Sequence, residues 1–294
     1  MFYDKESDFE DDLVAVLKRH GWTDGVLEYP TEQDLISNWA NILFDNNKGI
    51  DRLNGQRLTK GEMAQILEQI ETLRTPLALN SFINGKTVSI KRDNPADPAH
   101  FGKEISLKIY DRQEIAAGQS RYQIARQPMY PAKNKMLNDR RGDVCLLING
   151  MPVIHIELKK SGIPISQATN QIAKYAHEGV FTGLFRLVQV FVAMNPDDAV
   201  YFANPGEGDF NSNYFFHWAD FNNEPIAANK HVGQDEWKRF ASDLLSIPMA
   251  HQLIGFYTVA DSADGCLKVL RSYQYQAVNA ISDRVRTCKW DEPV

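Results

Sequence analysis

Apolar side chains recur every three or four residues in several stretches of the chain, the spacing that places them on one face of a helix. These stretches are 5–22, 31–45, 59–74, 234–246 and 267–290. Thr31 and Thr59 stand where N-cap residues are expected, and Glu62 completes a capping box with Thr59. In the last stretch, the spacing predicts four inward-facing side chains: Tyr275, Val278, Ile281 and Val285. The pattern thus predicts amphipathic helices near both ends of the chain and in its first quarter.

Shorter apolar or alternating runs predict strands between these helices. Four of them form the expected core of a sheet: 121–130, 142–149, 152–159 and 187–194. Residues 103–111 and 199–204 are further strand candidates, and 79–93 has the pattern of a hairpin that turns at Asn84-Gly85. We therefore predict an α/β fold, with a mixed central sheet flanked by helices and a helical insertion from residue 31 to 74.

The charge balance limits the partners of the chain. Its 294 residues carry a formal net charge of -6, from 32 Lys+Arg and 38 Asp+Glu. An acidic total argues against a general polyanion binder, so any contact with nucleic acid must come from a local basic groove. One basic group precedes the central strands: Lys133, Lys135, Arg140 and Arg141. These cations form either a solvated loop or a lip that contacts phosphates.

The cysteines and the hydropathy pattern suggest a compartment. Cys145, Cys266 and Cys288 have the spacing of neither a disulfide framework nor a zinc site, and they suit a reducing environment. No apolar run approaches the ~18–20 residues of a membrane span, and the acidic N-terminus is unlike a signal peptide. We expect a cytoplasmic protein without a membrane partner.

Charged residues stand at strand ends in the central stretch, where a hydrophobic core would otherwise continue. Asp143 opens one strand, and Glu157 and Lys159 close the next. A two-residue loop at Asn149-Gly150 would pair Asp143 with Ile156, whereas a three-residue loop or an equivalent bulge pairs it with Glu157. We predict the longer loop or the bulge, with the two carboxylates brought together.

Two carboxylates at close range repel each other unless a cation lies between them. Hard oxygen ligands select Mg²⁺ or Mn²⁺, and the backbone carbonyl of Leu158 is a further candidate ligand. Such a metal makes hydroxide available near neutral pH, and Lys159 would orient that water or neutralise charge in the transition state. The simpler interpretation is an exposed salt bridge between Lys159 and Asp143 or Glu157. His155 shares the face of Glu157, where a core or supporting role is favoured over a chemical one.

The order of these groups resembles the PD-(D/E)XK nuclease superfamily. An Asp, an apolar hairpin, Glu-x-Lys and a helix with Gln-x-x-x-Tyr follow one another, and Gln171 and Tyr175 match the motif of its RecB-like branch. More closely, RRGDVCLLINGMPVIHIELKKSG, NQIAKY and QVFVAMN resemble the nuclease domain of the R (restriction, or HsdR) subunit of type I restriction–modification enzymes. In that family Pro usually precedes the first acidic residue, whereas Gly142 stands there in this chain.

The resemblance implies a role for each matching position. The metal ligands would be Asp143, Glu157 and the backbone carbonyl of Leu158. Lys159 would be the catalytic lysine. Gln171 and Tyr175 would position DNA or support the site, unless they are only a polar helix face that packs on the sheet edge.

The first helix of this family often offers an acidic residue to the site. Glu10 is the best match for that residue and Glu6 the second. The alternative is structural: Ser7 and Glu10 stand three apart as in a capping box, and the acidic first turn is then simply solvated.

The segment LRSYQYQAV resembles the glutamine motif that precedes the first RecA-like domain of superfamily 2 helicases. Gln274 would then read the adenine edge of ATP, although the neighbouring residues are also explained as core. The resemblance implies the N-terminal part of a longer motor protein. Its endonuclease domain would span 1–260, with a catalytic core at about 105–205 and the helix 6–20 included. Residues 261–294 would be a linker and the start of a RecA-like helicase domain.

The function implied by the resemblance is Mg²⁺-dependent (or Mn²⁺-dependent) cleavage of double-stranded DNA. In the full subunit, cleavage would be coupled to ATP-driven DNA translocation, within a complex with methylation (M) and specificity (S) subunits. Two alternatives stay open. One is a stand-alone repair or junction nuclease of the same superfamily, and the other is a catalytically silent module that serves assembly or guides DNA.

Overall fold

The computed structural model describes residues 2–115, 120–130, 140–206, 208–228, 235–261, 263 and 266–288. A mixed six-stranded sheet lies at its centre, in the strand order β1-β4-β7-β8-β9-β10. These strands are β1 (Val26–Glu28), β4 (Tyr122–Arg126), β7 (Val144–Ile148), β8 (Met151–Leu158), β9 (Val190–Met194) and β10 (Ala199–Ala203). β1 is parallel to β4 and β8 to β9, while the other neighbours are antiparallel. The predicted α/β fold with a mixed central sheet is confirmed.

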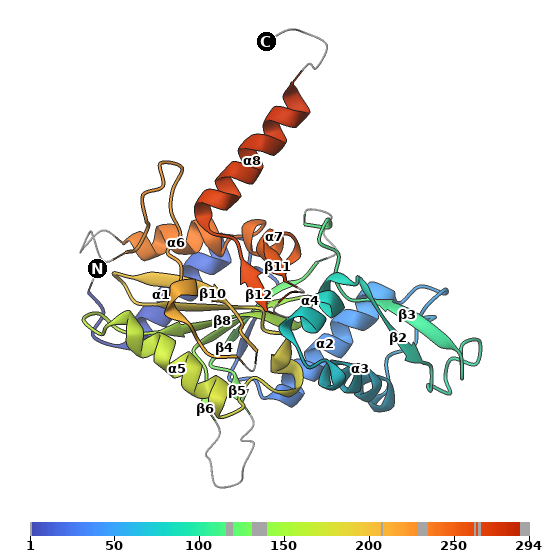
Figure 1. The fold of residues 1–294 in the computed structure, drawn as a ribbon. Coiled ribbons are helices and arrows are strands. Elements are labelled where there is room, and N and C mark those ends of the chain that lie inside the picture. Colours follow the sequence, from blue (N-terminus) through green and yellow to red (C-terminus); the bar gives the residue numbers. More distant parts are fainter. Residues whose placement is uncertain are drawn as a thin grey trace.

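Helices cover both faces of this sheet, which is why its central strands are apolar on both sides. α5 (Ile165–His177) connects the parallel strands β8 and β9 and lies on one side (Figure 1). α6 (Glu236–Leu244) and α7 (Met249–Gly255) lie on the other side. α1 (Glu6–Arg19) packs against α6 through Phe9 and Trp237, whose ring centroids are 5.0 Å apart.

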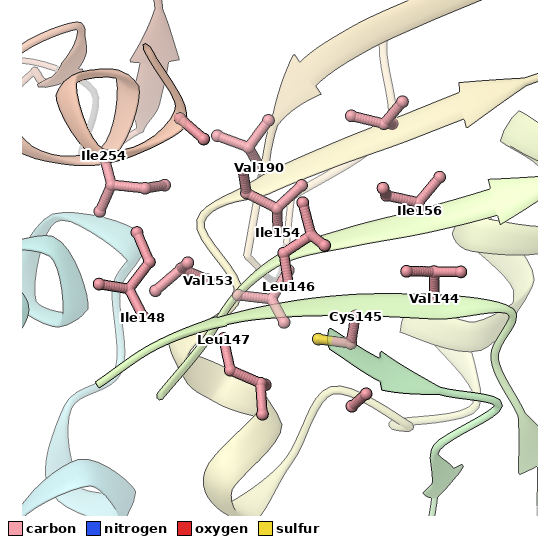
Figure 2. Packing of buried hydrophobic residues seen from close by; sticks show 14 of the residues in the cluster. Val144, Cys145, Leu146, Leu147, Ile148, Val153, Ile154, Ile156, Val190 and Ile254 are labelled. Atoms are coloured by element: carbon pink, nitrogen blue, oxygen red, sulfur yellow. The ribbon is translucent and has the colours of Figure 1, made fainter. Parts of the chain in front are cut away.

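The core between the sheet and α7 is built from aligned residues of neighbouring strands. Leu146, Ile154 and Val190 lie side by side across β7, β8 and β9 and are fully buried (Figure 2). Cys145 and Leu147 point to the opposite face of β7, as strand alternation requires. The face that carries Cys145 also carries His155 and Glu157 on β8, so the charged residues lie on the side opposite Ile154 and Ile156.

The insertion between β1 and β4 is longer than the predicted 31–74. It contains α2 (Glu32–Asn47), α3 (Lys60–Thr72), α4 (Pro76–Asn84), β2 (Thr87–Lys91) and β3 (Glu104–Lys108). The Thr31 side chain caps α2, and the predicted capping box of Thr59 and Glu62 opens α3. Both helices begin where their capping residues indicate.

The hairpin predicted at Asn84-Gly85 is wrong, because the residues before it form helix α4. The Thr75 hydroxyl accepts a hydrogen bond from the backbone N–H of Ala78, and Pro76 occupies the first turn, where its missing N–H costs nothing. Asn84-Gly85 therefore ends a helix instead of turning a hairpin. β2 follows as a separate strand and pairs with β3.

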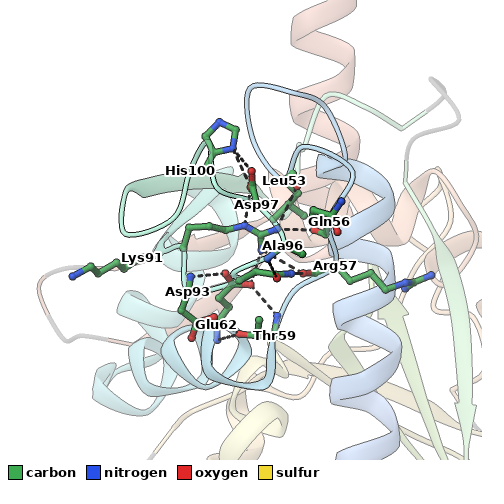
Figure 3. Close-up of polar contacts among 12 residues, drawn as sticks. Leu53, Gln56, Arg57, Thr59, Glu62, Lys91, Asp93, Ala96, Asp97 and His100 are labelled. Atoms are coloured by element: carbon green, nitrogen blue, oxygen red, sulfur yellow. Dashed lines mark hydrogen bonds and ion pairs between the residues drawn. The ribbon is translucent and has the colours of Figure 1, made fainter.

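A buried arginine, Arg92, holds the insertion together, and Figure 3 labels its partners Glu62, Asp97 and Gln56. Arg92, at the end of β2, donates from Nη1 to Glu62 Oε2 at 2.7 Å and from Nε to Asp97 Oδ2 at 3.1 Å. Its Nη2 donates to the backbone carbonyl of Gln56 at 2.8 Å. These side chains are fully buried, so the guanidinium depends on these partners to offset its desolvation.

The predicted strand 121–130 is divided in two. β4 ends at Arg126 because Gln127 has a φ of 48° and Pro128 follows, which lacks the N–H that a ladder needs. β5 (Met129–Tyr130) then leaves the main sheet and pairs with β6 (Arg140–Arg141). The chain thereby turns Tyr130 toward the end of β8.

Helix α8 (Ser272–Thr287) projects from the body of the molecule (Figure 1). Beside it lies a small hairpin, β11 (Thr258–Ala260) and β12 (Leu267–Val269). The prediction that Val278, Ile281 and Val285 face inward is wrong: they are 43%, 65% and 53% exposed. Tyr275 alone of that set packs inward, against Trp218 and Tyr257. The spacing identified an apolar face, but α8 projects from the body of the molecule after its first turn (Figure 1).

Two short 3₁₀ helices complete the fold, η1 (Gly183–Leu187) and η2 (Ser212–Tyr214). Within the part of the chain that the structure describes, none of the helices is both long enough and apolar enough to cross a membrane.

Candidate active site

A bulge in the β7–β8 hairpin brings Asp143 to Glu157. Ile148 pairs with Met151, so the loop has two residues, Asn149 and Gly150, whose φ values of 53° and 83° suit a type I′ turn. The register shifts next to Leu146, which pairs with Ile154, and Val153 is the extra residue. The predicted bulge is therefore confirmed, and the three-residue loop offered beside it is wrong.

The two carboxylates meet at the end of this ladder. Asp143 Oδ2 accepts a hydrogen bond from the backbone N–H of Leu158 at 2.6 Å. Burial, followed by the charge of Glu157, raises the pKa of Asp143 well above its ordinary value. Glu157 is fully buried, and burial raises its pKa to about 7 even though Lys159 opposes the shift. Both groups therefore resist carrying a negative charge at neutral pH unless a cation joins them.

Lys159 is the cation nearest to this pair. Its Nζ donates to the Leu158 carbonyl at 2.6 Å and lies 3.5 Å from Glu157 Oε1. The same Nζ lies 3.7 Å from Glu6 Oε1. The salt bridge considered in the sequence thus exists, but it is buried, not exposed.

The donor set suits a hard divalent cation. Among the described residues, no group of three or more His, Cys, Asp and Glu side chains could hold a metal. Two carboxylates and the Leu158 carbonyl are nevertheless what Mg²⁺ commonly takes from a protein, since water supplies its other ligands. Glu157 Oε1 already faces a positive charge, 3.5 Å from Lys159 Nζ. The residues present therefore fit such an ion.

The first helix brings two carboxylates to the edge of the site. Glu10 is buried and accepts hydrogen bonds from Arg126 Nε and, at 3.1 Å, from Gln127 Nε2. Its charge contributes to the raised pKa of Asp143. α1 begins at Glu6 with Lys5 as N-cap and no side-chain capping bond, so the capping box of Ser7 and Glu10 is wrong. Glu6 therefore lies within ion-pair distance of Lys159, whereas Glu10 is paired with Arg126.

Gln171 and Tyr175 form a short chain of hydrogen bonds. Gln171 Nε2 donates to Tyr175 Oη at 2.7 Å, and that hydroxyl donates to the backbone carbonyl of Arg141 at 3.0 Å. Burial, followed by the charge of Glu157, raises the pKa of Tyr175 to about 12. The pair thus ties α5 to the strand that leads into Asp143.

The cations that form either a solvated loop or a phosphate-contacting lip are only partly available to a ligand. Arg140 makes a two-point contact with Glu178, at 2.7 and 2.8 Å. Arg141 is exposed, and its guanidinium lies 5.5 Å from the ring centre of Tyr29. Lys133 and Lys135 lie outside the described residues.

Sequence reasoning missed Tyr130, which joins His155 behind the carboxylates. Tyr130 Oη lies 2.8 Å from His155 Nδ1, and His155 Nε2 lies 3.4 Å from Glu157 Oε2. Burial lowers the pKa of His155 to about 4, so the imidazole is neutral at neutral pH. Strand alternation alone indicated that His155 accompanies Glu157. Tyr130 comes from 25 residues away through β5, a contact that no local pattern reveals.

Gln274 lies far along the chain from these groups. Its Oε1 accepts a hydrogen bond from the backbone N–H of Arg271 at 2.9 Å and so caps α8. It lines a cavity of about 860 Å³ between α8, the β11–β12 hairpin and the segment 209–216. The lining includes Phe215, Arg271 and Tyr273.

Comparison with known proteins identifies the family of this chain. The family model described as "Type I restriction enzyme R protein N terminus" matches residues 6–210, more than two thirds of the chain. The Type I restriction enzyme SsaAORF53P endonuclease subunit of Staphylococcus saprophyticus is 30% identical over 285 residues, covering 96% of this chain and 27% of that protein. The SauCOLORF180P endonuclease subunit of Staphylococcus aureus is 27% identical over 281 residues, with the same coverage.

For a third relative, the matched region makes up most of both proteins. The Type I restriction enzyme EcoprrI endonuclease subunit of Escherichia coli is 28% identical over 282 residues, which are 90% of this chain and 83% of that protein. The chain spans about a quarter of the length of the staphylococcal relatives. The residues that the family model matches include both carboxylates, Lys159 and α5. The chain therefore belongs to the family of type I restriction enzyme R protein N termini.

Proposed function

We propose that this chain is the nuclease module of a type I restriction enzyme and that it hydrolyses phosphodiester bonds of double-stranded DNA with a divalent metal. The observation that carries the proposal is the carboxylate pair that the bulge assembles beside Lys159. Two adjacent carboxylates with raised pKa values are costly to stability and are explained by a cation that joins them. Membership of the restriction-subunit family and the names of its relatives support the same reaction.

Each residue at the site then has a defined task. Asp143, Glu157 and the Leu158 carbonyl would hold Mg²⁺ or Mn²⁺, which polarises a phosphoryl oxygen and acidifies water when bound. The Leu158 carbonyl accepts a hydrogen bond from Lys159 Nζ, so it would become a metal ligand once that ammonium turns away. Lys159 then neutralises the negative charge that develops on the phosphate or orients the attacking water. Glu6 lies close enough to Lys159 to guide that movement.

Residues around the site would position the DNA. Gln171 and Tyr175 hold the carbonyl of Arg141, so they fix the strand that carries Asp143 into the site. Arg141 is exposed beside them and can contact a phosphate. Arg140 supports the same strand through Glu178. Glu10 keeps Arg126 in place at the edge of the sheet.

The proposal extends to a full-length protein that carries a helicase domain beside the nuclease. Residues 1–260 would be the endonuclease domain, and 261–294 a linker and the start of a RecA-like helicase domain in which Gln274 meets the adenine of ATP. Cleavage would then be coupled to ATP-driven translocation, with methylation and specificity subunits as partners. The length of the staphylococcal relatives, of which this chain spans 27%, supports a longer protein.

The test uses the full-length subunit assembled with its methylation and specificity partners. Asp143→Ala and Lys159→Ala should each abolish plasmid cleavage while ATP hydrolysis persists, because the two activities would reside in different domains. Asp51→Asn, at an exposed position in the insertion, is the matched control and should cleave normally. Normal cleavage by either active-site variant would exclude this site and favour a silent module.

A further inference from the structure

Two buried atoms at the site lack the partners that their neighbourhood requires. Within the described part of the chain, His155 Nε2 and Glu157 Oε2 have no hydrogen-bond partner, although both side chains are fully buried. The two atoms lie 3.4 Å apart, slightly beyond an ordinary N–H···O distance. A small movement of the Glu157 carboxylate would join them. The two atoms are therefore best understood as the donor and the acceptor of one hydrogen bond.

Tyr130 and the charge of Glu157 together determine which of the two atoms carries the proton. Its hydroxyl lies 2.8 Å from His155 Nδ1. If the hydroxyl donates, Nδ1 is the acceptor, so Nε2 carries a hydrogen that faces Glu157 Oε2. The opposite tautomer would place the Nε2 lone pair against an ionised carboxylate, which repels it. An ionised Glu157, as a cation would require, is compatible only with the first arrangement.

The Tyr130 ring is held firmly enough to set this direction. It is 1% exposed, and the ring of Phe185 lies at 4.5 Å in an edge contact. Phe181 packs on both members of the pair, at 6.0 Å from Tyr130 and 5.4 Å from His155. Neither ring can turn without displacing this aromatic layer.

Gly142 supplies the space that the pair occupies. A Cβ atom at this position would lie 2.6 Å from Tyr130 Oη and 3.0 Å from His155 Cε1. Any larger residue would therefore push the hydroxyl or the imidazole away from its present position. This contact is a steric reason for glycine at the position where the resembling family usually has proline.

We infer that Tyr130 and His155 are positioning residues that hold Glu157 Oε2 and leave Oε1 facing the cation, with Gly142 as the space that admits them. The inference rests on the proposed function, in which Glu157 is a metal ligand. Oε1 is the oxygen that already faces a positive charge, 3.5 Å from Lys159 Nζ. Side chains that orient a ligand in this way commonly change metal affinity by about 10–100-fold when removed.

The direct test is the tautomer of His155 in the chain saturated with Mg²⁺, the state in which Glu157 is ionised. ¹⁵N spectra of the imidazole should show the proton on Nε2 in the wild type. Tyr130→Phe removes only the donor hydroxyl, so the Nδ1 resonance should shift as that nitrogen loses its hydrogen bond, while the proton stays on Nε2 facing the ionised Glu157. A proton fixed on Nδ1 in the wild type would overturn the inference. An Nδ1 resonance that Tyr130→Phe leaves unchanged would also overturn it.

The second test is Mn²⁺ affinity, measured by calorimetric titration without DNA. Tyr130→Phe and His155→Phe should each weaken Mn²⁺ binding, His155→Phe by about tenfold or more. Tyr122→Phe is the matched control, because its hydroxyl bonds His251 Nδ1 at 2.9 Å in a buried Tyr–His pair elsewhere in the fold. Its Mn²⁺ affinity should equal that of the wild type.

These results separate the inference from the proposed function. If Glu157→Ala loses Mn²⁺ while Tyr130→Phe and His155→Phe bind it normally, the positioning role is refuted and the nuclease proposal stands. If Glu157→Ala binds Mn²⁺ as the wild type does, the proposed function fails, and with it the purpose of the pair. Gly142→Ala gives an independent check, since displacing the rings should weaken Mn²⁺ binding in the same direction.

Discussion

Replacing Glu157 by Gln should stabilise the metal-free chain at neutral pH while removing its metal. Gln has the shape of a protonated glutamate but cannot ionise. The carboxyl of Glu157 has a pKa of about 7 in the fold, compared with its ordinary 4.5. One pKa unit corresponds to about 1.4 kcal/mol. An ionised Glu157 therefore costs the folded state about 3 kcal/mol, which the Gln variant avoids.

The effect has a definite pH dependence. Between the ordinary pKa and the raised one, the folded wild type binds more protons than the unfolded chain, so its free energy of unfolding falls as pH rises from about 4.5 to 7. The advantage of Glu157→Gln should be near zero below pH 4.5, grow across this interval and level off above pH 7. The raised pKa of Asp143 acts in the same direction.

Urea unfolding followed by tryptophan fluorescence measures this difference, in a chelator and then in excess Mg²⁺. Mg²⁺ at a hundred times its dissociation constant adds about 2.7 kcal/mol to a chain that binds it, so the wild type should nearly regain parity. Glu178→Gln is the control. Its pKa is lowered by the hydrogen bond from Arg140, so that substitution should destabilise the chain, and less so at acidic pH. Equal stability of wild type and Glu157→Gln at pH 8 in chelator would refute the reasoning.

Three further predictions concern other parts of the molecule. Arg92→Met should lower the free energy of unfolding by about 3–5 kcal/mol, because it leaves Glu62 and Asp97 buried without their cation; urea unfolding that finds less than 1 kcal/mol would contradict this. Arg141→Ala should weaken DNA binding and reduce its salt dependence by about one counterion. Arg140→Ala should change DNA binding less, because Arg140 is already paired with Glu178. Fluorescence anisotropy titrations across a salt series that show the larger loss for Arg140→Ala would refute the assignment. Ile281→Ser should change stability by less than about 0.5 kcal/mol, since Ile281 is exposed on α8; a larger loss in thermal unfolding would mean that this face is covered.

Local chemistry made part of the fold predictable. The capping boxes at Thr31 and Thr59 are short-range hydrogen-bond patterns, so the sequence places both helix starts correctly. The Asn84-Gly85 signal misled because the same dipeptide also ends helices, and the cap at Thr75 decides between the two. Helical spacing on α8 shows which residues share a face but not whether anything packs on it.

At the site too, features set by neighbouring residues could be predicted, whereas contacts between residues far apart in the sequence could not. Alternation and the parity of the hairpin required that Asp143 meet Glu157 by an odd loop or a bulge, but not which of the two. The bulge at Val153 depends on pairing along the whole ladder. Gly150 has the positive φ that a regular two-residue turn needs, so the extra residue lies in the strand and not in the turn. The contact of Tyr130 with His155 depends on where β5 leaves the sheet, and so it lies beyond sequence reasoning.

The bulge also has a consequence for how this hairpin varies among relatives. Val153 has no counterpart on β7, and the pairs on either side, Leu147 with Pro152 and Leu146 with Ile154, do not depend on it. A relative that lacks this one residue would lose the irregularity and still place its two carboxylates opposite each other. A single-residue gap in an alignment of the family should therefore fall here, and not in the turn at Gly150 or between Ile154 and Glu157.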